Sequence, residues 1–152
     1  MKQPKHPCTY DIRHTSYWNF FTNYYSPKLR ELDILLKSIE GGGISTAEAS
    51  DLLCVTEQSV REIMKKNGIK IIDRCSLLQI MMHGNSSLCR LLQREFKCGS
   101  PNVYHPGEIA YIYGLQVYQV EEACNKTSFG EEIPAELLPE VLDKIHIYIM
   151  AS

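Results

Sequence analysis

Between Thr56 and Arg74 the chain concentrates the two kinds of side chain that a nucleic-acid surface needs. Amide, hydroxyl and carboxylate groups can hydrogen-bond to base edges, and Gln58 is suited to adenine in the major groove. Arginine and lysine neutralise phosphates, which supplies most of the non-specific affinity for DNA. The candidate DNA-binding residues are Thr56, Glu57, Gln58, Ser59, Arg61, Lys65, Lys66, Lys70 and Arg74.

Charge is distributed unevenly around this stretch. Residues 61–97 hold eight basic and three acidic side chains, a net charge of +5, whereas the whole chain has a net charge of −2. Residues 101–152 hold two basic and eight acidic side chains. Because this acidic part would repel phosphates, a DNA surface is expected in the middle of the chain.

Signatures of catalysis and of metal binding are missing from the sequence. It contains no GxGxxG, P-loop, HExxH or GxSxG motif, and its five histidines are far apart. The six cysteines include no CxxC pair and no Cys/His pair at ligand spacing, so we expect reduced thiols and no metal site. The sequence predicts a protein that is not an enzyme and uses no cofactor.

The spacing of apolar residues predicts two short helices that position the candidate residues. Ser45 with Glu48 has the form of a capping box, so a helix is expected to begin at Thr46. Its apolar side would consist of Ala49, Leu52 and Leu53. Thr56 can cap a second helix, which Asn67-Gly68 would end. The apolar side of that helix would consist of Val60, Ile63 and Met64.

Two helices joined by a turn of about three residues form a helix-turn-helix, whose second helix can enter the major groove. The N-terminal residues of that helix would then lie nearest the base edges, and they are Glu57, Gln58 and Ser59. Arg61 is placed to contact guanine or a phosphate. The expected phosphate contacts are Lys65, Lys66, Lys70 and Arg74.

Residues 44–80 contain the runs Thr46-Ala47-Glu48-Ala49, Leu52-Leu53-Cys54-Val55-Thr56, Val60-Arg61-Glu62-Ile63-Met64 and Gly68-Ile69. This stretch, about a quarter of the chain, resembles the helix-turn-helix of the excisionase and MerR-type regulators. Those regulators bind DNA with the second helix and a small wing, so the resemblance implies a short strand at 69–72. Cys54 departs from the glycine that is usual at the turn. A side chain at positive φ costs on the order of 1 kcal/mol, so the turn should be slightly altered.

Residues 104–129 repeat the pattern of residues 44–69 at a fixed offset of 60, which predicts a second helix-turn-helix. Here Gly114 stands at the turn, and Glu121 replaces Arg61. An acidic and aromatic outward surface suits a protein partner better than a phosphate backbone. The candidate partner-binding residues are Tyr111, Tyr113, Tyr118 and Glu121. The alternative is that this copy only completes the core.

Further helices are expected around the two motifs, and residues 1–9 are expected to form a flexible tail. An aromatic helix from about Thr15 to Tyr24 would pack over the core or form a dimer contact, and a bracing helix would begin at Ser26-Pro27. Two more helices are predicted over 76–82 and 87–97, the second with Arg90, Arg94 and Lys97 exposed. A last helix is predicted near the end of the chain, with an apolar stripe of Val141, Leu142, Ile145, Tyr148 and Ile149. The last would pack on the second motif or pair with its own copy.

The predicted fold is mostly α: a helical bundle built around two helix-turn-helix units, with a short β wing after the first. The expected domains are an N-terminal segment and bracing helix (1–43), a DNA-binding domain (44–100) and an acidic domain (101–152) for assembly or partner binding. No apolar run approaches the ~20 residues of a membrane span, and the N-terminal residues lack the apolar region of a secretory signal, so a cytoplasmic protein is expected.

Two functions remain open at this point. The first is a sequence-specific regulator of transcription that binds double-stranded DNA as a homodimer. The second is an inhibitor or adaptor that kept a helix-turn-helix scaffold and grips a protein through residues 104–152, as some mobile-element proteins such as anti-CRISPR proteins do.

Overall fold

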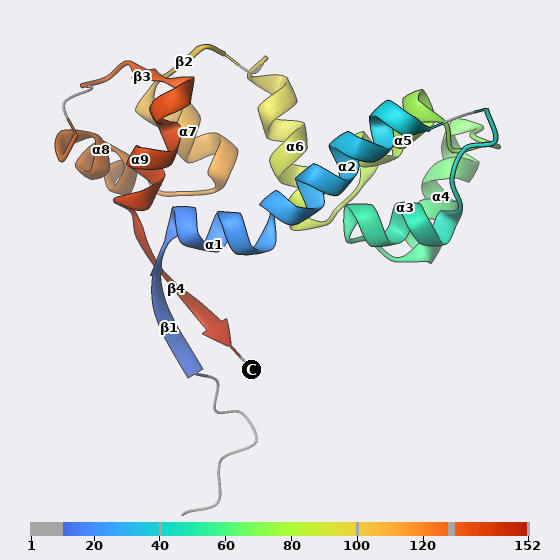
Figure 1. Ribbon diagram of the computed structural model, residues 1–152, viewed down its shortest axis with the longest axis horizontal. Coiled ribbons are helices and arrows are strands. Elements are labelled where there is room, and N and C mark those ends of the chain that lie inside the picture. The colour runs from blue at the N-terminus through green and yellow to red at the C-terminus, as the bar shows by residue number, and fades with distance from the viewer. Residues whose placement is uncertain (1–10, 40, 100, 128–129, 152) are drawn as a thin grey trace, which may run out of the picture.

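The computed structural model describes residues 11–39, 41–99, 101–127 and 130–151, so the tail expected for residues 1–9 lies outside it. Its α-helices are α1 (Tyr17–Tyr24), α2 (Ser26–Ser38), α3 (Thr46–Leu53), α4 (Glu57–Asn67), α5 (Arg74–His83), α6 (Ser87–Lys97), α7 (Pro106–Tyr113), α8 (Val117–Asn125) and α9 (Leu138–Asp143). Its other elements are the strands β1 (Asp11–Ser16), β2 (Val103–Tyr104), β3 (Ile133–Pro134) and β4 (His146–Ala151) and the 3-10 helix η1 (Ala135–Leu137). The mostly α fold is confirmed (Figure 1).

The first helix-turn-helix has the predicted bounds and the predicted caps. The Ser45 hydroxyl accepts the Glu48 N–H at 3.1 Å, and the Thr56 hydroxyl accepts the Ser59 N–H at 3.1 Å. Cys54 adopts the left-handed conformation at φ 56°, and Gly68 does so at φ 65° after α4. The turn therefore tolerates cysteine where glycine was expected.

The second helix-turn-helix is also confirmed, and the repeat extends beyond the two motifs. Helices α7 and α8 begin 60 residues after α3 and α4, with Gly114 at φ 68° in the turn. A β-bridge between Ile44 and Ile72 encloses the first pair, and the pairing of β2 with β3 encloses the second. A helix precedes each pair (α2, α6) and another follows it (α5, α9). The chain thus has the same order of four helices twice, and each set is called a unit below.

Two hydrophobic cores correspond to these units. The first consists of buried residues between Leu32 and Cys89, and the second of Tyr17 together with residues between Leu91 and Ile145. The cores divide within α6, earlier than the domain boundary expected near residue 100. In Figure 1 the two helix-turn-helix units lie at opposite ends of an elongated molecule, with α1, α2 and α6 between them.

The predicted wing after α4 is wrong. Residues 69–71 form no strand, and the backbone there makes a single bridge, in which the Ile44 N–H donates to the Ile72 carbonyl at 3.0 Å. Ile72 is buried in the first core, and Asp73 at once caps α5 by accepting the Ser76 N–H at 2.9 Å. Because the chain turns directly into a helix, no length remains for a returning wing strand.

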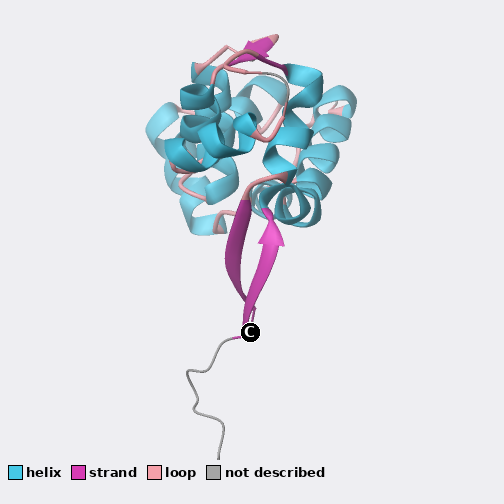
Figure 2. Ribbon diagram, turned by 90° about the vertical axis from the view of Figure 1, so that its left-hand side faces the viewer, coloured by secondary structure: helices cyan, strands magenta, loops and turns pink. Residues whose placement is uncertain are grey.

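The predicted last helix is too long. It ends at Asp143, and His146–Ala151 instead forms β4, which pairs antiparallel with β1 in a two-stranded ribbon that projects from the helices (Figures 1 and 2). From His146 to Ile149 exposed and half-buried side chains alternate, the period of a strand. The Tyr17 N–H donates to the Ile145 carbonyl at 2.7 Å and anchors the ribbon to α1.

The predicted aromatic helix is α1, and it packs on the second core. Ser16 caps it, Tyr17 is 5% exposed, and the rings of Trp18, Phe20 and Phe21 lie partly buried against the same core. This arrangement corresponds to the core-covering alternative for this segment. No helix in the described part of the chain is long and apolar enough to cross a membrane.

The left-handed conformation of Cys54 leads to a testable prediction about the free energy of unfolding. Replacing Cys54, an exposed residue at φ 56°, with glycine should raise the free energy of unfolding by about 1 kcal/mol, because glycine removes the steric strain of a Cβ at positive φ. Urea denaturation measures the change.

The matched control is Gly114→Ala in the second unit. A Cβ added there would meet its nearest neighbour, the Arg94 guanidinium, at 4.0 Å, an ordinary contact. Only backbone strain is introduced, so this variant should lose about 1 kcal/mol. Opposite signs for the two variants support the strain argument, and a destabilised Cys54→Gly protein contradicts it.

Candidate nucleic-acid interface

Helix α4 presents its polar side to solvent because its apolar side is held in the first core. Val60 is completely buried and Ile63 is 9% exposed, with Met64 partly buried beside them. Since residues three and four apart share a face of a helix, this packing turns the Arg61–Lys65 side outward. The first core therefore decides which residues α4 can offer to a ligand.

The structure brings the nine predicted DNA-binding residues together on α4 and its two flanks. The exposed ones are Thr56, Gln58, Arg61, Lys65, Lys66, Lys70 and Arg74, and the half-buried ones are Glu57 and Ser59. Lys70 lies in the connection after α4 rather than on a wing strand, and Arg74 is the first residue of α5. No segment of the described chain covers the arginine and lysines of α4, which lies at the far end of the molecule from α8 (Figure 1).

Three of the expected base-reading side chains, Glu57, Gln58 and Arg61, are engaged within α4 itself. The Arg61 guanidinium donates to the Glu57 carboxylate at 2.7 Å, and the Gln58 amide donates to the Glu62 carboxylate at 3.1 Å. Exposed pairs four residues apart on a helix are each worth about 0.3–0.5 kcal/mol. A base edge or a phosphate could therefore replace either partner at little cost.

The other basic residues remain available to an anion. Within the described part of the chain, Lys65, Lys66, Lys70 and Arg74 take part in no salt bridge. One carboxylate, that of Asp73, lies between Lys70 and Arg74 in the sequence. It accepts a hydrogen bond from the Ser76 N–H, which holds the pKa of Asp73 below its usual range. Asp73 thus stays ionised and reduces the positive charge at the start of α5.

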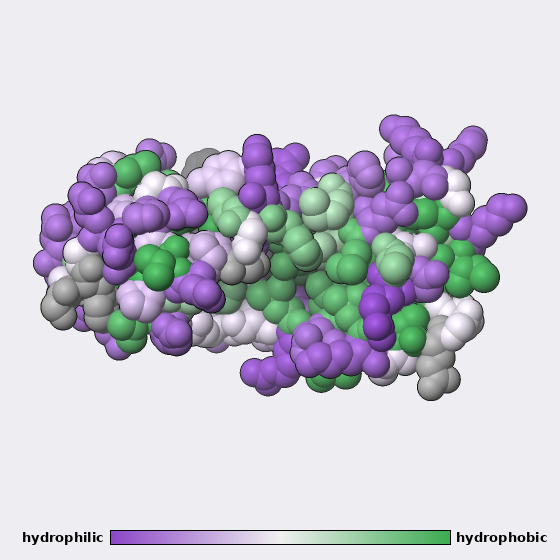
Figure 3. All heavy atoms as spheres, turned by 90° about the horizontal axis from the view of Figure 1, so that it is seen from above, coloured by the Kyte–Doolittle hydropathy of each residue, from purple (hydrophilic) through white to green (hydrophobic). Residues whose placement is uncertain are grey.

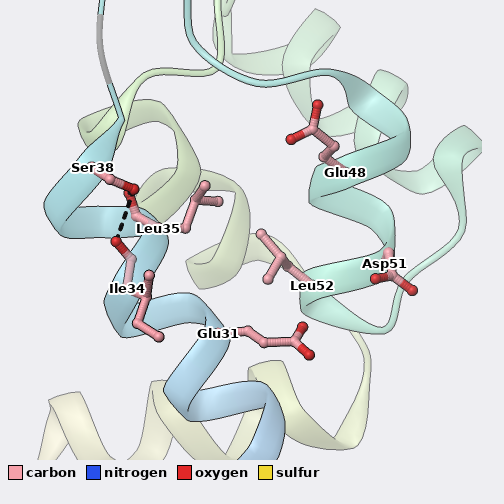
Figure 4. Close-up of a pocket in the computed structure, with 7 residues that line it drawn as sticks. All are labelled: Glu31, Ile34, Leu35, Ser38, Glu48, Asp51 and Leu52. Atoms are coloured by element: carbon pink, nitrogen blue, oxygen red, sulfur yellow. Dashed lines mark hydrogen bonds between the residues drawn. The ribbon is translucent and has the colours of Figure 1, made fainter.

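The opposite side of the first unit is acidic. A groove between α2 and α3 is lined by residues that include Glu31, Glu48 and Asp51, with Leu35 and Leu52 between the two helices; the Asp51 carboxylate points away from Leu52 (Figure 4). Lys28 approaches two of these carboxylates, with its Nζ 3.8 Å from Glu31 and 3.4 Å from Asp51. Because carboxylates repel phosphates, this groove is unfavourable for a duplex.

In the second unit three of the four predicted partner-binding residues lie on the surface. Tyr111 is 45% exposed, Tyr118 is 66% exposed, and Glu121 is exposed beside Glu122. Val117, 47% exposed at the start of α8, adds an apolar side chain that the sequence reasoning missed. The outward face of α8 is thus acidic and partly apolar.

Tyr113 is the exception, and its expected place on that surface is wrong. Its ring packs on the second core and lies 5.7 Å from the ring of Tyr17 and 5.8 Å from that of Phe21. Burial, together with the nearby Glu95 carboxylate, raises the pKa of its hydroxyl. Tyr113 therefore joins α1 to α7 and is not available to a partner.

Arg94 was expected on an exposed helix face and is also more enclosed than predicted. Its Nε–H donates to the Ile112 carbonyl at 2.8 Å, which ties α6 to the end of α7. Phe96 and Met82, neither expected at a surface site, are 55% and 44% exposed beside it. With Lys97 and Tyr111 they line a second groove.

Comparisons of the chain with models of protein families, with curated proteins and with solved structures found no match. Within the described residues no group of three or more histidine, cysteine, aspartate or glutamate side chains is arranged to hold a metal ion.

The different burial of Tyr113 and Tyr118 can be tested by replacing each with alanine. Tyr113→Ala should lower the free energy of unfolding by about 2–3 kcal/mol, because it removes a packed ring from the second core. Tyr118→Ala removes an exposed ring and should change it by less than about 0.5 kcal/mol. Urea denaturation compares the two, and equal losses would refute this assignment.

Proposed function

We propose that the protein is a sequence-specific regulator of transcription that binds double-stranded DNA through α4. The proposal rests mainly on how α4 is packed and on which of its side chains are exposed. It is capped at both ends, it is held by its apolar side, and it carries Arg61, Lys65 and Lys66 uncovered at one end of the molecule. The resemblance of residues 44–80 to the excisionase and MerR-type regulators supports it.

The two ends of α4 would contact different parts of the DNA. Its N-terminal end carries Gln58 and, one turn later, Arg61, whose side chains suit adenine and guanine edges in the major groove. Its C-terminal end carries Lys65 and Lys66, which would hold the phosphates on either side. Release of Arg61 from Glu57 would accompany binding, since one guanidinium cannot keep that bond and read a guanine.

The proposal includes a cytoplasmic location and a homodimer. One helix of this length reads few base pairs, and regulators of this type usually engage two half-sites. Self-pairing of the terminal helix was one of two alternatives for that helix, but the helix ends at Asp143 and residues 146–151 form a strand of the ribbon. A dimer therefore requires a different surface.

The alternative is an inhibitor or adaptor that binds a protein through the acidic second unit. The exposed side chains of Val117, Tyr118 and Glu121 on α8 favour it, because aromatic and apolar groups dominate protein interfaces. This function needs no DNA, so a single titration separates the two.

The test is a titration with mixed-sequence duplex DNA at several salt concentrations, followed by fluorescence anisotropy. The wild-type protein should bind more weakly as salt rises. Arg61→Ala combined with Lys65→Ala should weaken binding and reduce the slope of log K against log salt by about 1 for each phosphate that the variant no longer neutralises.

Lys126→Ala is the control, since this exposed lysine at the end of α8 takes the place of Lys66 in the second unit. It should leave the affinity and the slope unchanged. A double variant with the wild-type slope would contradict the assignment of α4, and no binding at low salt would favour the protein-binding alternative.

A further inference from the structure

The same groove occurs in both four-helix units, between the first helix and the helix that follows it. In the first unit it lies between α2 and α3, and in the second between α6 and α7, where the end of α5 also reaches it. At the offset of 60, two lining positions correspond. Ile34 stands where the second unit has Arg94, and Asp51 stands where it has Tyr111.

The groove of the first unit, here the acidic groove, is apolar at its floor and negative at its rim. Leu35 and Leu52 form the floor, and Ile34, 61% exposed, stands at its edge (Figure 4). The acidic residues Glu31, Glu48 and Asp51 are among those that line its cavity of about 340 Å³. Lys28 is the one cation close to them among the described salt bridges, so negative charge remains in excess.

The groove of the second unit, here the basic groove, has the opposite charge. Phe96, Met82 and Tyr111 provide apolar and aromatic surface around a cavity of about 490 Å³. Arg94 and Lys97 carry its charge, and no carboxylate is among its lining residues. The Lys97 ammonium lies 5.8 Å above the Tyr111 ring, which keeps the cation at the rim of the groove.

Both grooves carry exposed apolar side chains, Ile34 at the first and Phe96 and Met82 at the second. Figure 3 shows apolar atoms gathered along the middle of the face that it presents, between hydrophilic surfaces toward both ends. Each groove alone would fit many partners. The two grooves together indicate a particular partner, because each has the charge opposite to that of the other and both have apolar groups.

We propose that the partner of each groove is a second copy of this chain: the acidic groove of one copy packs against the basic groove of the next. Phe96 and Met82 of one copy would cover the Leu35–Leu52 floor of the other. Lys97 and Arg94 would meet Glu48 and Asp51. The two grooves of one molecule cannot meet each other, because each is fixed between helices of a different unit.

Such a contact joins two different surfaces, so it relates successive copies head to tail and leaves one groove of each kind free at the ends of a pair. It differs from the self-pairing of a terminal helix, in which the same surface of both copies would meet. It does not require DNA, and α4 takes no part in it, so its failure would leave the proposed DNA binding untouched.

Sedimentation velocity of the full chain without DNA tests the proposal. The wild-type protein should associate reversibly with rising concentration, and salt should weaken the association. Asp51→Lys reverses a charge in the acidic groove and Lys97→Glu reverses one in the basic groove. Each variant alone should associate at least about tenfold more weakly, because like charges then face each other.

The decisive sample is an equimolar mixture of these two variants. The Lys97→Glu protein keeps an intact acidic groove and the Asp51→Lys protein keeps an intact basic groove, so the mixture should form pairs that neither variant forms alone. Glu132→Lys, a reversal at an exposed position in neither groove, should associate like the wild type.

Thermal melting establishes that each variant is folded. If Asp51→Lys proves unfolded, Ile34→Ser, which removes an exposed apolar group from the same groove, takes its place and should weaken association too. A wild-type protein that stays monomeric at every concentration reached would overturn the proposal. So would variants that associate like the wild type, or weakened variants whose mixture does not recover.

Discussion

The packing of α6 into both cores holds the two units of this protein together. At its start, the Ser86 hydroxyl donates to the Leu53 carbonyl at 2.6 Å and Cys89 is buried in the first core. Further along, Leu91 enters the second core and Arg94 bonds to the end of α7. Because one helix serves both cores, the two helix-turn-helix motifs are kept apart at opposite ends of the molecule.

The local features of each motif could be read from the sequence because their causes are local. Caps at Ser45 and Thr56, a stop at Gly68 and the periodicity of apolar residues depend on neighbours within about one turn of helix. The left-handed turn at Cys54 was expected instead from the resemblance to regulators that usually have glycine there. What these patterns could not supply was the contact between distant segments.

The misplaced residues show which distant contacts mattered. Tyr113 was assigned to the surface although the offset of 60 places it at the position of Leu53, which is completely buried, so the repeat itself carried the signal. At the same offset Arg94 takes the place of Ile34, which is 61% exposed, so the repeat gave no signal that Arg94 would be enclosed. The strand at 146–151 left a weaker signal, because its pairing partner lies at the other end of the chain.

That pairing of Asp11–Ser16 with His146–Ala151 also sets an order of events during synthesis. The helices of the first unit find their partners within residues 26–89, so this unit can fold while the ribosome is still making the second. The ribbon cannot close until residue 151 has been added. Until then β1 has an unpaired edge, an opening for misassociation between nascent chains.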